Sequence, residues 1–141
     1  MHMEREIYTP PEGNPPVNQE LFTLFDKVGE EKLRKLVDLF YDEIPNTSII
    51  DMFPEDLSES KKKAADFMVQ VTGGPQYYTH NYRQPKMRQQ HFEFEIDEKA
   101  RRAWLGAYKK ALGKSDIDEK SKEIIWEYLN SFSTWMVNKK S

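Results

Sequence analysis

The chain has 141 residues, a length typical of one domain, and its 21 basic and 24 acidic residues leave a net charge of −3. No stretch approaches the roughly 18 consecutive apolar residues of a membrane span, and the N-terminus lacks the apolar core of a secretory signal. The absence of Cys excludes disulfides, a thiol nucleophile and Cys-ligated metal sites. Because the charge balance is near neutral, there is no electrostatic footprint for nucleic acid. We therefore expect a cytoplasmic protein with neither a membrane nor a nucleic acid as partner.

Apolar bulk is scarce in this chain, but it is concentrated in large rings. Hydrophobic residues make up 38% of the sequence, and exchanging Tyr for Gly in the count, as the usual reference set does, leaves that share below the roughly 45–50% of typical domains. Aromatic residues make up 13%. Disorder usually combines low hydrophobicity with high net charge and few aromatic residues, so this composition favours a folded domain.

The first part of the chain is rich in proline and the remainder has helical spacing. Four prolines within seven positions predict an extended arm over residues 1–17, followed by a folded domain over residues 18–141. Asn18 is a candidate N-cap for a short helix that Gly29 breaks. An apolar stripe from Leu33 to Ile44 then predicts a three-turn helix that Pro45 ends.

The next segments alternate between short and long helices. Residues 46–57 predict turns and short helical pieces, and Ser58 is a candidate N-cap for a third helix that Gly73 and Gly74 end. A polar, Tyr-rich loop is predicted over residues 75–84, and Pro85 suits the first turn of a short helix that ends near His91.

Two longer helices complete the chain. Asp97 is a candidate N-cap for the first, and the second runs from about Ser115 or Asp118 to Asn138. Phe92, Phe94 and Ile96 alternate too briefly to build a sheet. The fold class predicted from the sequence is all-α.

Few residues suggest chemistry by themselves. His2 lies in the terminal arm and His80 in a polar segment, so both are interpreted as solvated, whereas His91 borders an apolar stretch. Two interpretations of His91 stay open at this point, a histidine at the edge of the core and a ligand. Tyr41 and Trp104 lie on apolar helix faces, and a buried Tyr hydroxyl or Trp N–H needs a partner. That partner is either a backbone acceptor or a bound ligand on which both donors converge.

Several motifs, in their order and spacing, resemble the group II truncated haemoglobins over about residues 19–137. The resemblance rests on Phe40-Tyr41, Phe53-Pro54-Glu55-Asp56-Leu57, Phe67 six residues before Gly73-Gly74, the segment Gly73 to Thr79, Pro85, Met87-Arg88, His91-Phe92-x-Phe94-x-Ile96 and Trp104-Leu105. The Trp thirteen residues after the His is where group II carries one.

This resemblance implies a small globin fold, two helices on two helices, that encloses haem b. His91 matches the histidine that binds the iron. On the opposite side of the iron it places Tyr41, Trp104 and Ser60 as groups that stabilise the bound ligand. Cofactor contacts are implied for Phe53, Ala64, Phe67, Tyr78, Arg88 and Phe94, and the haem would supply the apolar bulk that the composition lacks.

The sequence also departs from the family pattern at three positions. Phe53 stands where many relatives carry Tyr, so one ligand-side hydroxyl is missing. Ala64 replaces a larger residue, which would widen the pocket. Gln90 replaces the Arg that often precedes the histidine, which weakens the case for a propionate contact there.

The leading functional hypothesis is a haem protein that binds dioxygen, and also nitric oxide, carbon monoxide or peroxide, as a monomer or a homodimer. One alternative is a redox enzyme, a nitric oxide dioxygenase or a peroxidase-like catalyst, that would need an unidentified electron donor. A further alternative is a haem-free helical interaction module in which Tyr41 and Trp104 are core residues.

Overall fold

A computed structural model describes residues 19–83 and 95–139. Its α-helices and 3₁₀-helices (η) are, in chain order, η1 (Gln19–Thr23), α1 (Leu24–Val28), α2 (Glu30–Glu43), η2 (Ile44–Asn46), η3 (Ile50–Met52), α3 (Ser58–Val71), α4 (Tyr77–Tyr82), α6 (Glu98–Lys114) and α7 (Glu119–Met136). Within these described residues no strand occurs, and no helix is long and apolar enough to cross a membrane. The all-α prediction is confirmed.

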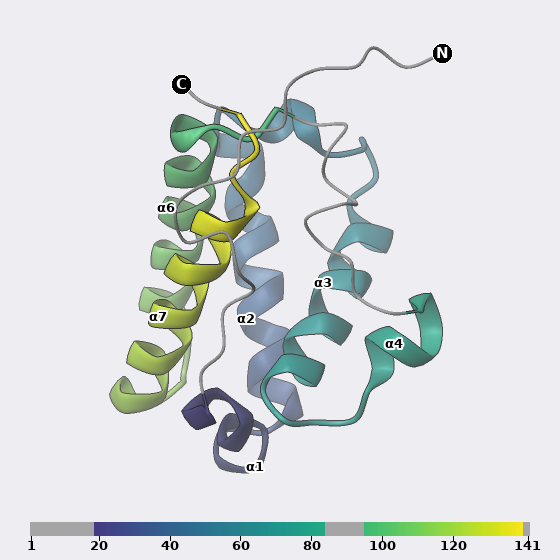
Figure 1. Ribbon diagram of the computed structural model, residues 1–141, viewed down its shortest axis with the longest axis vertical. Coiled ribbons are helices and arrows are strands. Elements are labelled where there is room, and N and C mark those ends of the chain that lie inside the picture. Colours follow the sequence, from purple (N-terminus) through teal and green to yellow (C-terminus); the bar gives the residue numbers. More distant parts are fainter. Residues whose placement is uncertain (1–18, 84–94, 140–141) are drawn as a thin grey trace.

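The four long helices pack around α2, which lies at the centre. Helix α2 packs against both α3 and α6, and α6 packs against α7 (Figure 1). One hydrophobic cluster runs through all four helices and includes Leu36, Phe40, Met68, Leu105 and Leu129. This arrangement agrees with the expectation of two helices on two, and it places the side chains of α2, α3, α6 and α7 around one interior.

The helix starts show which capping predictions hold. Asp97 and Asp118 are N-caps, because their carboxylates accept hydrogen bonds from Ala100 N at 2.9 Å and Ser121 N at 3.0 Å. The prediction for Ser58 is wrong, since this residue is already the first in α3. The polar contact at the start of α3 comes from Asp56 instead, whose carboxylate accepts hydrogen bonds from both the backbone N and the hydroxyl of Ser58.

The prediction of a loop over residues 75–84 is also wrong, because Tyr77–Tyr82 forms α4. The side chain of Gln70 in α3 explains why this polar segment becomes helical. Its amide oxygen accepts from Thr79 N at 2.9 Å, and its amide nitrogen donates to the Thr79 hydroxyl at 2.8 Å. Tyr78, next to Thr79 in α4, is buried. Tertiary contacts thus stabilise a short helix that has no apolar period in the sequence.

An ion pair with a buried carboxylate fixes the same corner of the molecule. The Asp66 side chain of α3 is 5% exposed and lies 2.9 Å from an Arg34 guanidinium nitrogen of α2. Arg34 also pairs with Glu30 at 2.9 Å and lies over the ring of Tyr77. Asn81 Nδ2 donates to the second Asp66 oxygen at 3.4 Å. Helices α2, α3 and α4 are therefore joined through one carboxylate.

The last helix ends earlier than predicted, at Met136, and the chain then turns back toward α6. Asn138 is fully buried, and its side-chain oxygen accepts a hydrogen bond from Ile96 N at 2.9 Å. Asn138 N donates to the Ile96 carbonyl oxygen at 2.9 Å. These bonds bring the two segments 42 positions apart side by side.

Several predictions fall on residues that are not described. These are the proline-rich arm over residues 1–17, the Asn18 cap, the short helix from Pro85 to His91 and the alternation at Phe92 and Phe94.

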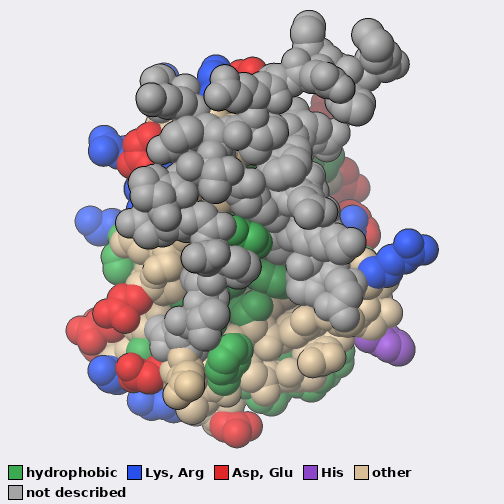
Figure 2. All heavy atoms as spheres, viewed as in Figure 1, with side chains coloured by type: hydrophobic (Ala, Val, Ile, Leu, Met, Phe, Trp, Pro, Cys, Tyr) green, Lys and Arg blue, Asp and Glu red, His purple; other side chains and the backbone are tan. Residues whose placement is uncertain are grey.

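On the face drawn in Figure 2, charged side chains lie around the outline and hydrophobic side chains reach the surface near the centre.

Candidate functional site

A cavity of about 470 Å³ lies in the interior between the two helix pairs. Its walls come from α2, α3, α6 and α7, together with residues of the segment around η3. Nine aromatic residues line it, namely Phe40, Tyr41, Phe53, Phe67, Tyr78, Trp104, Tyr108, Tyr128 and Phe132. Packed protein interiors leave few voids larger than a water molecule. A cavity of this size is therefore typical of a ligand-binding site.

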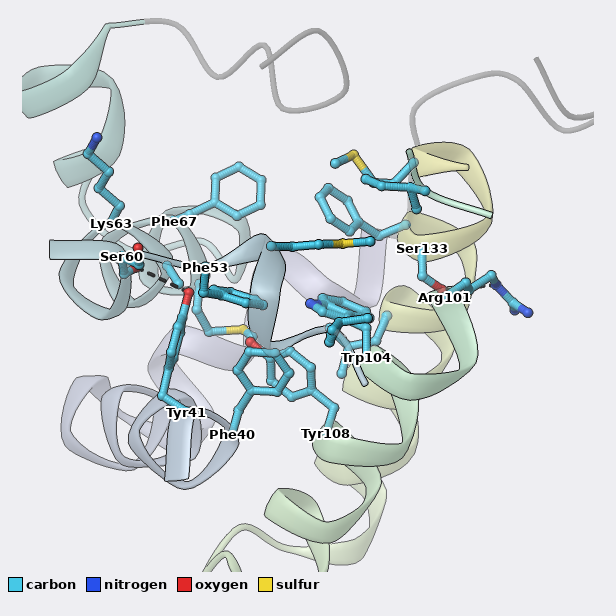
Figure 3. Close-up of a pocket in the computed structure, with 18 of the residues that line it drawn as sticks. Phe40, Tyr41, Phe53, Ser60, Lys63, Phe67, Arg101, Trp104, Tyr108 and Ser133 are labelled. Carbon is cyan, nitrogen blue, oxygen red and sulfur yellow. Dashed lines mark hydrogen bonds between the residues drawn. The ribbon is translucent and has the colours of Figure 1, made fainter. Parts of the chain in front are cut away.

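Tyr41 projects from α2 into this cavity and is only 7% exposed. Its hydroxyl donates to the backbone carbonyl oxygen of Ser60 in α3 at 3.3 Å, which is long for an O–H donor (Figure 3). Burial raises the pKa of the Tyr41 phenol to about 12. The phenol therefore keeps its proton at neutral pH and stays a hydrogen-bond donor.

Trp104 reaches the same cavity from α6, and Figure 3 shows its indole nitrogen directed toward the space beside Phe53. No described residue accepts a hydrogen bond from the Trp104 N–H, and none pairs with the Ser60 hydroxyl, which also lines the cavity. The Trp104 N–H and the Ser60 hydroxyl are thus polar groups of the cavity wall that have no hydrogen-bond partner among residues 19–83 and 95–139.

Ring contacts hold the two donors in place. Phe40 meets Tyr41 edge-on at 5.1 Å between ring centroids and meets Trp104 edge-on at 5.8 Å. Phe53 closes the other side of Tyr41 at 5.8 Å, again edge-on. Edge-to-face geometry at these distances is the favoured arrangement of aromatic pairs, so neither donor can turn away from the cavity without losing contacts.

Most of the site residues expected from the sequence meet at this cavity. It is lined by Tyr41, Ser60 and Trp104 among the expected ligand-side groups, and by Phe53, Ala64, Phe67 and Tyr78 among the expected cofactor contacts. Phe67 packs edge-on against Tyr78 at 5.5 Å. His91, Arg88 and Phe94 lie outside the described residues, so their roles stay predictions.

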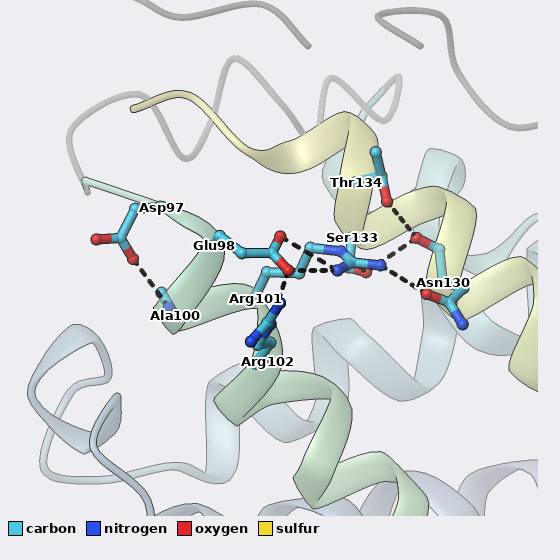
Figure 4. Close-up of polar contacts among 8 residues, drawn as sticks. All are labelled: Asp97, Glu98, Ala100, Arg101, Arg102, Asn130, Ser133 and Thr134. Carbon is cyan, nitrogen blue, oxygen red and sulfur yellow. Dashed lines mark hydrogen bonds and ion pairs between the residues drawn. The ribbon is translucent and has the colours of Figure 1, made fainter. Parts of the chain in front are cut away.

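Arg101 lines the cavity with its stem, but its guanidinium is engaged elsewhere (Figure 4). It donates to both carboxylate oxygens of Glu98, to Asn130 Oδ1 at 2.6 Å and to the Ser133 hydroxyl at 3.2 Å. All these partners lie on α6 and α7. Arg101 therefore ties these two helices together and is no free cation for a ligand in the cavity.

Sequence reasoning missed two tyrosines of the cavity wall, Tyr108 and Tyr128. Tyr108 follows Trp104 by four positions and so lies on the same face of α6. Tyr128 belongs to the apolar stripe of α7. The argument applied to Tyr41, that a buried hydroxyl needs a partner, applies equally to both and would have singled them out.

The fold and this cavity define a class, a helical protein with an apolar chamber between two helix pairs and hydrogen-bond donors in its wall. Comparison with known proteins narrows the class. The family model for bacterial-like globin matches residues 23–138. The chain is 32% identical over 115 residues to group 2 truncated hemoglobin YjbI of Bacillus subtilis (strain 168), across 81% of this chain and 87% of that one.

Solved structures agree with the sequence relatives. The group II truncated hemoglobin of Bacillus anthracis is 31% identical, with a TM-score of 0.81 over 91% of this chain and 96% of that chain. Phosphate-bound Hell's gate globin IV is 35% identical, with a TM-score of 0.84 over 100% of this chain and 88% of that chain. The chain therefore belongs to the bacterial-like globin family, and its relatives include group II truncated haemoglobins, as the sequence motifs predicted.

Globins hold a haem and bind small gaseous ligands such as oxygen, and the cavity fits such a cofactor. Its volume of about 470 Å³ falls within the roughly 300–1,000 Å³ of ligand pockets in general. Its ring-lined walls suit a flat apolar macrocycle, and the donors Tyr41 and Trp104 leave one region of the wall polar.

Proposed function

We propose that this protein binds haem b in the cavity, with His91 as the iron ligand, and that Tyr41 and Trp104 donate hydrogen bonds to a diatomic ligand, above all dioxygen. The observation that carries the proposal is the pair of donors at one apolar cavity, of which the Trp104 N–H has no described protein partner. A few polar groups placed in an otherwise apolar cavity wall are typical of ligand sites, where they fix the orientation of the ligand.

When bound, the haem supplies an iron that holds the diatomic ligand and places negative charge on it. The chain's part is to meet that charge with donors from two different helices, α2 and α6. Trp104 can donate without giving up another bond. Tyr41 must exchange its bond with the Ser60 carbonyl oxygen, which at 3.3 Å is a weak competitor. Nitric oxide, carbon monoxide and peroxide are further ligands of the same site.

The cavity itself favours this function over a haem-free interaction module. A module whose Tyr41 and Trp104 are only core residues would pack its interior to the usual density. A cavity of about 470 Å³ with the Trp104 N–H, which has no described partner, in its wall is instead typical of a ligand site. The module predicts a colourless protein that is stable without a cofactor, whereas our proposal predicts a pigment.

The role of His91 is tested by replacing it with Ala and measuring how fast haem passes from the protein to an excess of a haem acceptor. His80→Ala is the matched control, because His80 is an exposed residue of α4 that does not line the cavity. We expect His91→Ala to lose haem many times faster than the wild type, and imidazole in solution to restore part of the loss. His80→Ala should behave as the wild type.

Equal haem loss from both variants would show that His91 is not the iron ligand. Unchanged spectra of His91→Ala, in the ferrous and the ferric state, would lead to the same conclusion. Binding of haem by the wild type is a separate observation, so the cavity assignment survives if only the choice of histidine fails.

A further inference from the structure

Two exposed lysines of α3 converge on one tyrosine ring of α4. Lys62 Nζ donates a hydrogen bond to the Tyr82 hydroxyl at 3.1 Å, and the ammonium nitrogens of Lys62 and Lys63 both lie 5.5 Å from the centroid of the Tyr82 ring. Ammonium groups at this distance are attracted by an aromatic ring. Tyr82 thus holds two positive charges beside a single ring at the protein surface.

Neither of these two ammonium groups forms an ion pair within residues 19–83 and 95–139. The preceding lysine differs, because Lys61 Nζ lies 3.7 Å from the Asp38 carboxylate of α2. The hydrogen bond to Tyr82 raises the pKa of Lys62, so this group is fully charged at neutral pH. Helix α3 therefore carries one paired lysine followed by two unpaired ones.

The nearby carboxylates do not neutralise the two lysines. Glu59 and Asp66 are the carboxylates that act on the charge of Lys62. Asp66 is buried and pairs with Arg34 at 2.9 Å, which leaves Glu59 alone against two lysines. Arg83, exposed directly after α4, adds a further positive charge to this corner. The corner is therefore positive, although the whole chain has a net charge of −3.

The ring beside these charges is connected to the cavity by packed rings. Tyr82 contacts Tyr78 at 5.1 Å between ring centroids, and Tyr78 contacts Phe67 edge-on at 5.5 Å. Tyr78 and Phe67 line the cavity, and so does Lys63 itself. The positive surface therefore lies at the edge of the cavity, and contiguous aromatic contacts lead from it into the cavity wall.

We propose that Lys62, Lys63 and Tyr82 form the docking surface for an acidic electron-carrier protein, which holds a flavin or an iron–sulfur cluster and reduces the iron of the bound haem. The proposal rests on the proposed function, because the electron needs the haem iron as its acceptor. The carrier's cofactor loses one electron and ferric iron gains it, and no bond forms or breaks. The transfer keeps the iron ferrous, the state that binds dioxygen.

The chemistry of this surface fits an acidic protein better than a small anion. Exposed lysines contribute little affinity for a small ion in water, but they steer a large partner of opposite charge into the right orientation. Complexes that transfer electrons have small, transient interfaces, and two charges around one aromatic ring suit such an encounter. Docking here brings the carrier next to the cavity edge that Lys63 lines.

Reduction of the ferric protein by the hydroquinone of flavodoxin, an acidic flavoprotein, tests this surface. The double variant Lys62→Gln with Lys63→Gln should be reduced at least about fivefold more slowly than the wild type at low ionic strength, because charge steering accelerates association about 10- to 1000-fold. Added salt should diminish the difference, since it screens exposed charges. The neutral lumiflavin semiquinone should reduce both proteins equally fast, because a small uncharged donor does not use the surface.

The matched control is Lys61→Gln with Lys109→Gln, which removes the same number of positive charges elsewhere. Lys61 belongs to the ion pair with Asp38, Lys109 is an exposed residue of α6, and neither lines the cavity. Its reduction by flavodoxin should stay within about twofold of the wild-type rate. Equal slowing of both double variants, or a wild-type rate for the Lys62 and Lys63 variant, would overturn the proposal.

Binding provides a readout that does not need electron transfer. NMR amide shifts of the purified isotope-labelled protein should change around Lys62, Lys63 and Tyr82 when oxidised flavodoxin is added. Shifts centred elsewhere, or the same shifts with inorganic phosphate alone at equal concentration, would contradict the docking surface. A protein that holds no haem would refute the proposed function and with it the electron transfer, whereas the shift map still decides whether the acidic protein docks here.

Discussion

Replacement of Tyr41 by Phe removes one hydroxyl from the proposed ligand site and leaves the ring in place. The edge-on contacts of this ring, with Phe40 at 5.1 Å and with Phe53 at 5.8 Å, do not involve the hydroxyl. Within residues 19–83 and 95–139, the only hydrogen bond that the substitution deletes is the one to the Ser60 carbonyl oxygen at 3.3 Å. The variant therefore isolates the donor function of Tyr41.

The magnitude follows from exchanging one bond for another. A hydrogen bond to a charge-bearing partner contributes about 1.5–3 kcal/mol, and the neutral bond given up to the Ser60 carbonyl oxygen contributes about 0.5–1 kcal/mol. The difference is about 0.5–2.5 kcal/mol. Since about 1.4 kcal/mol corresponds to a tenfold change, dioxygen should dissociate roughly 2- to 60-fold faster from Tyr41→Phe than from the wild type.

The assay is stopped-flow displacement of dioxygen by excess carbon monoxide. Tyr82→Phe is a suitable control, because it removes a phenol hydroxyl that lies outside the cavity wall. Carbon monoxide dissociation should change less than dioxygen dissociation, because carbon monoxide carries less charge when bound. A dioxygen rate within about twofold of the wild type, or a slower one, would refute the assignment of Tyr41 as a donor.

Three further predictions concern stability. The pKa of Tyr41, about 12, lies above its ordinary value of 10.0, so the unfolded chain loses this proton first. The free energy of unfolding should stay constant up to about pH 10 and fall toward pH 12. In urea titrations at alkaline pH, Tyr41→Phe should lose less stability than the wild type, and an equal loss would contradict burial of the phenol. Asp66→Asn should lower the free energy of unfolding by about 1–3 kcal/mol, because the Asp66 carboxylate is buried, against less than about 0.5 kcal/mol for Asp38→Asn, whose ion pair is exposed. Equal effects would contradict a stabilising role of the buried carboxylate. Gly73→Ala should destabilise by about 1–3 kcal/mol in the same assay, because its φ is +98° and an added Cβ would collide with the backbone of η1. Gly113→Ala should not destabilise the protein, because a Cβ added at Gly113 meets open space. Equal effects of the two substitutions would argue against the close approach of the backbone at Gly73.

The sequence predicted much of the helical core because helix periodicity and capping are local signals. The stripe from Leu33 to Ile44 and the caps at Asp97 and Asp118 illustrate this. Helix α4 could not be predicted in the same way, since it depends on a side chain from α3, Gln70, that bonds to Thr79. Contacts between segments far apart in the chain have no local signature.

The candidate site shows the same division. Tyr41 and Trp104 stood out because each lies on an apolar face and carries a polar atom, and the resemblance to group II truncated haemoglobins implied that they are donors to a ligand. The cavity brings both to one place. The partner of the Tyr41 hydroxyl, the Ser60 carbonyl oxygen, was not predictable, because every residue has such an oxygen. Tyr108 and Tyr128 were missed, although the argument for Tyr41 applies to them unchanged.

The composition and the cavity lead to the same expectation. A chain with 38% hydrophobic residues leaves a space of about 470 Å³ among its aromatic rings, which a haem would fill with apolar surface. Haem should therefore contribute much of the stability, because a ligand that binds only the folded state stabilises it in proportion to the logarithm of its concentration over Kd.

The most direct test of the account is a titration of the purified haem-free chain with haem, followed by visible absorption and thermal unfolding together. We predict a Soret band that saturates at about one haem per chain, and an unfolding midpoint that rises with each addition until that point. A band that grows without saturation, with an unfolding midpoint that does not move, would contradict the central claim that this cavity is a haem site.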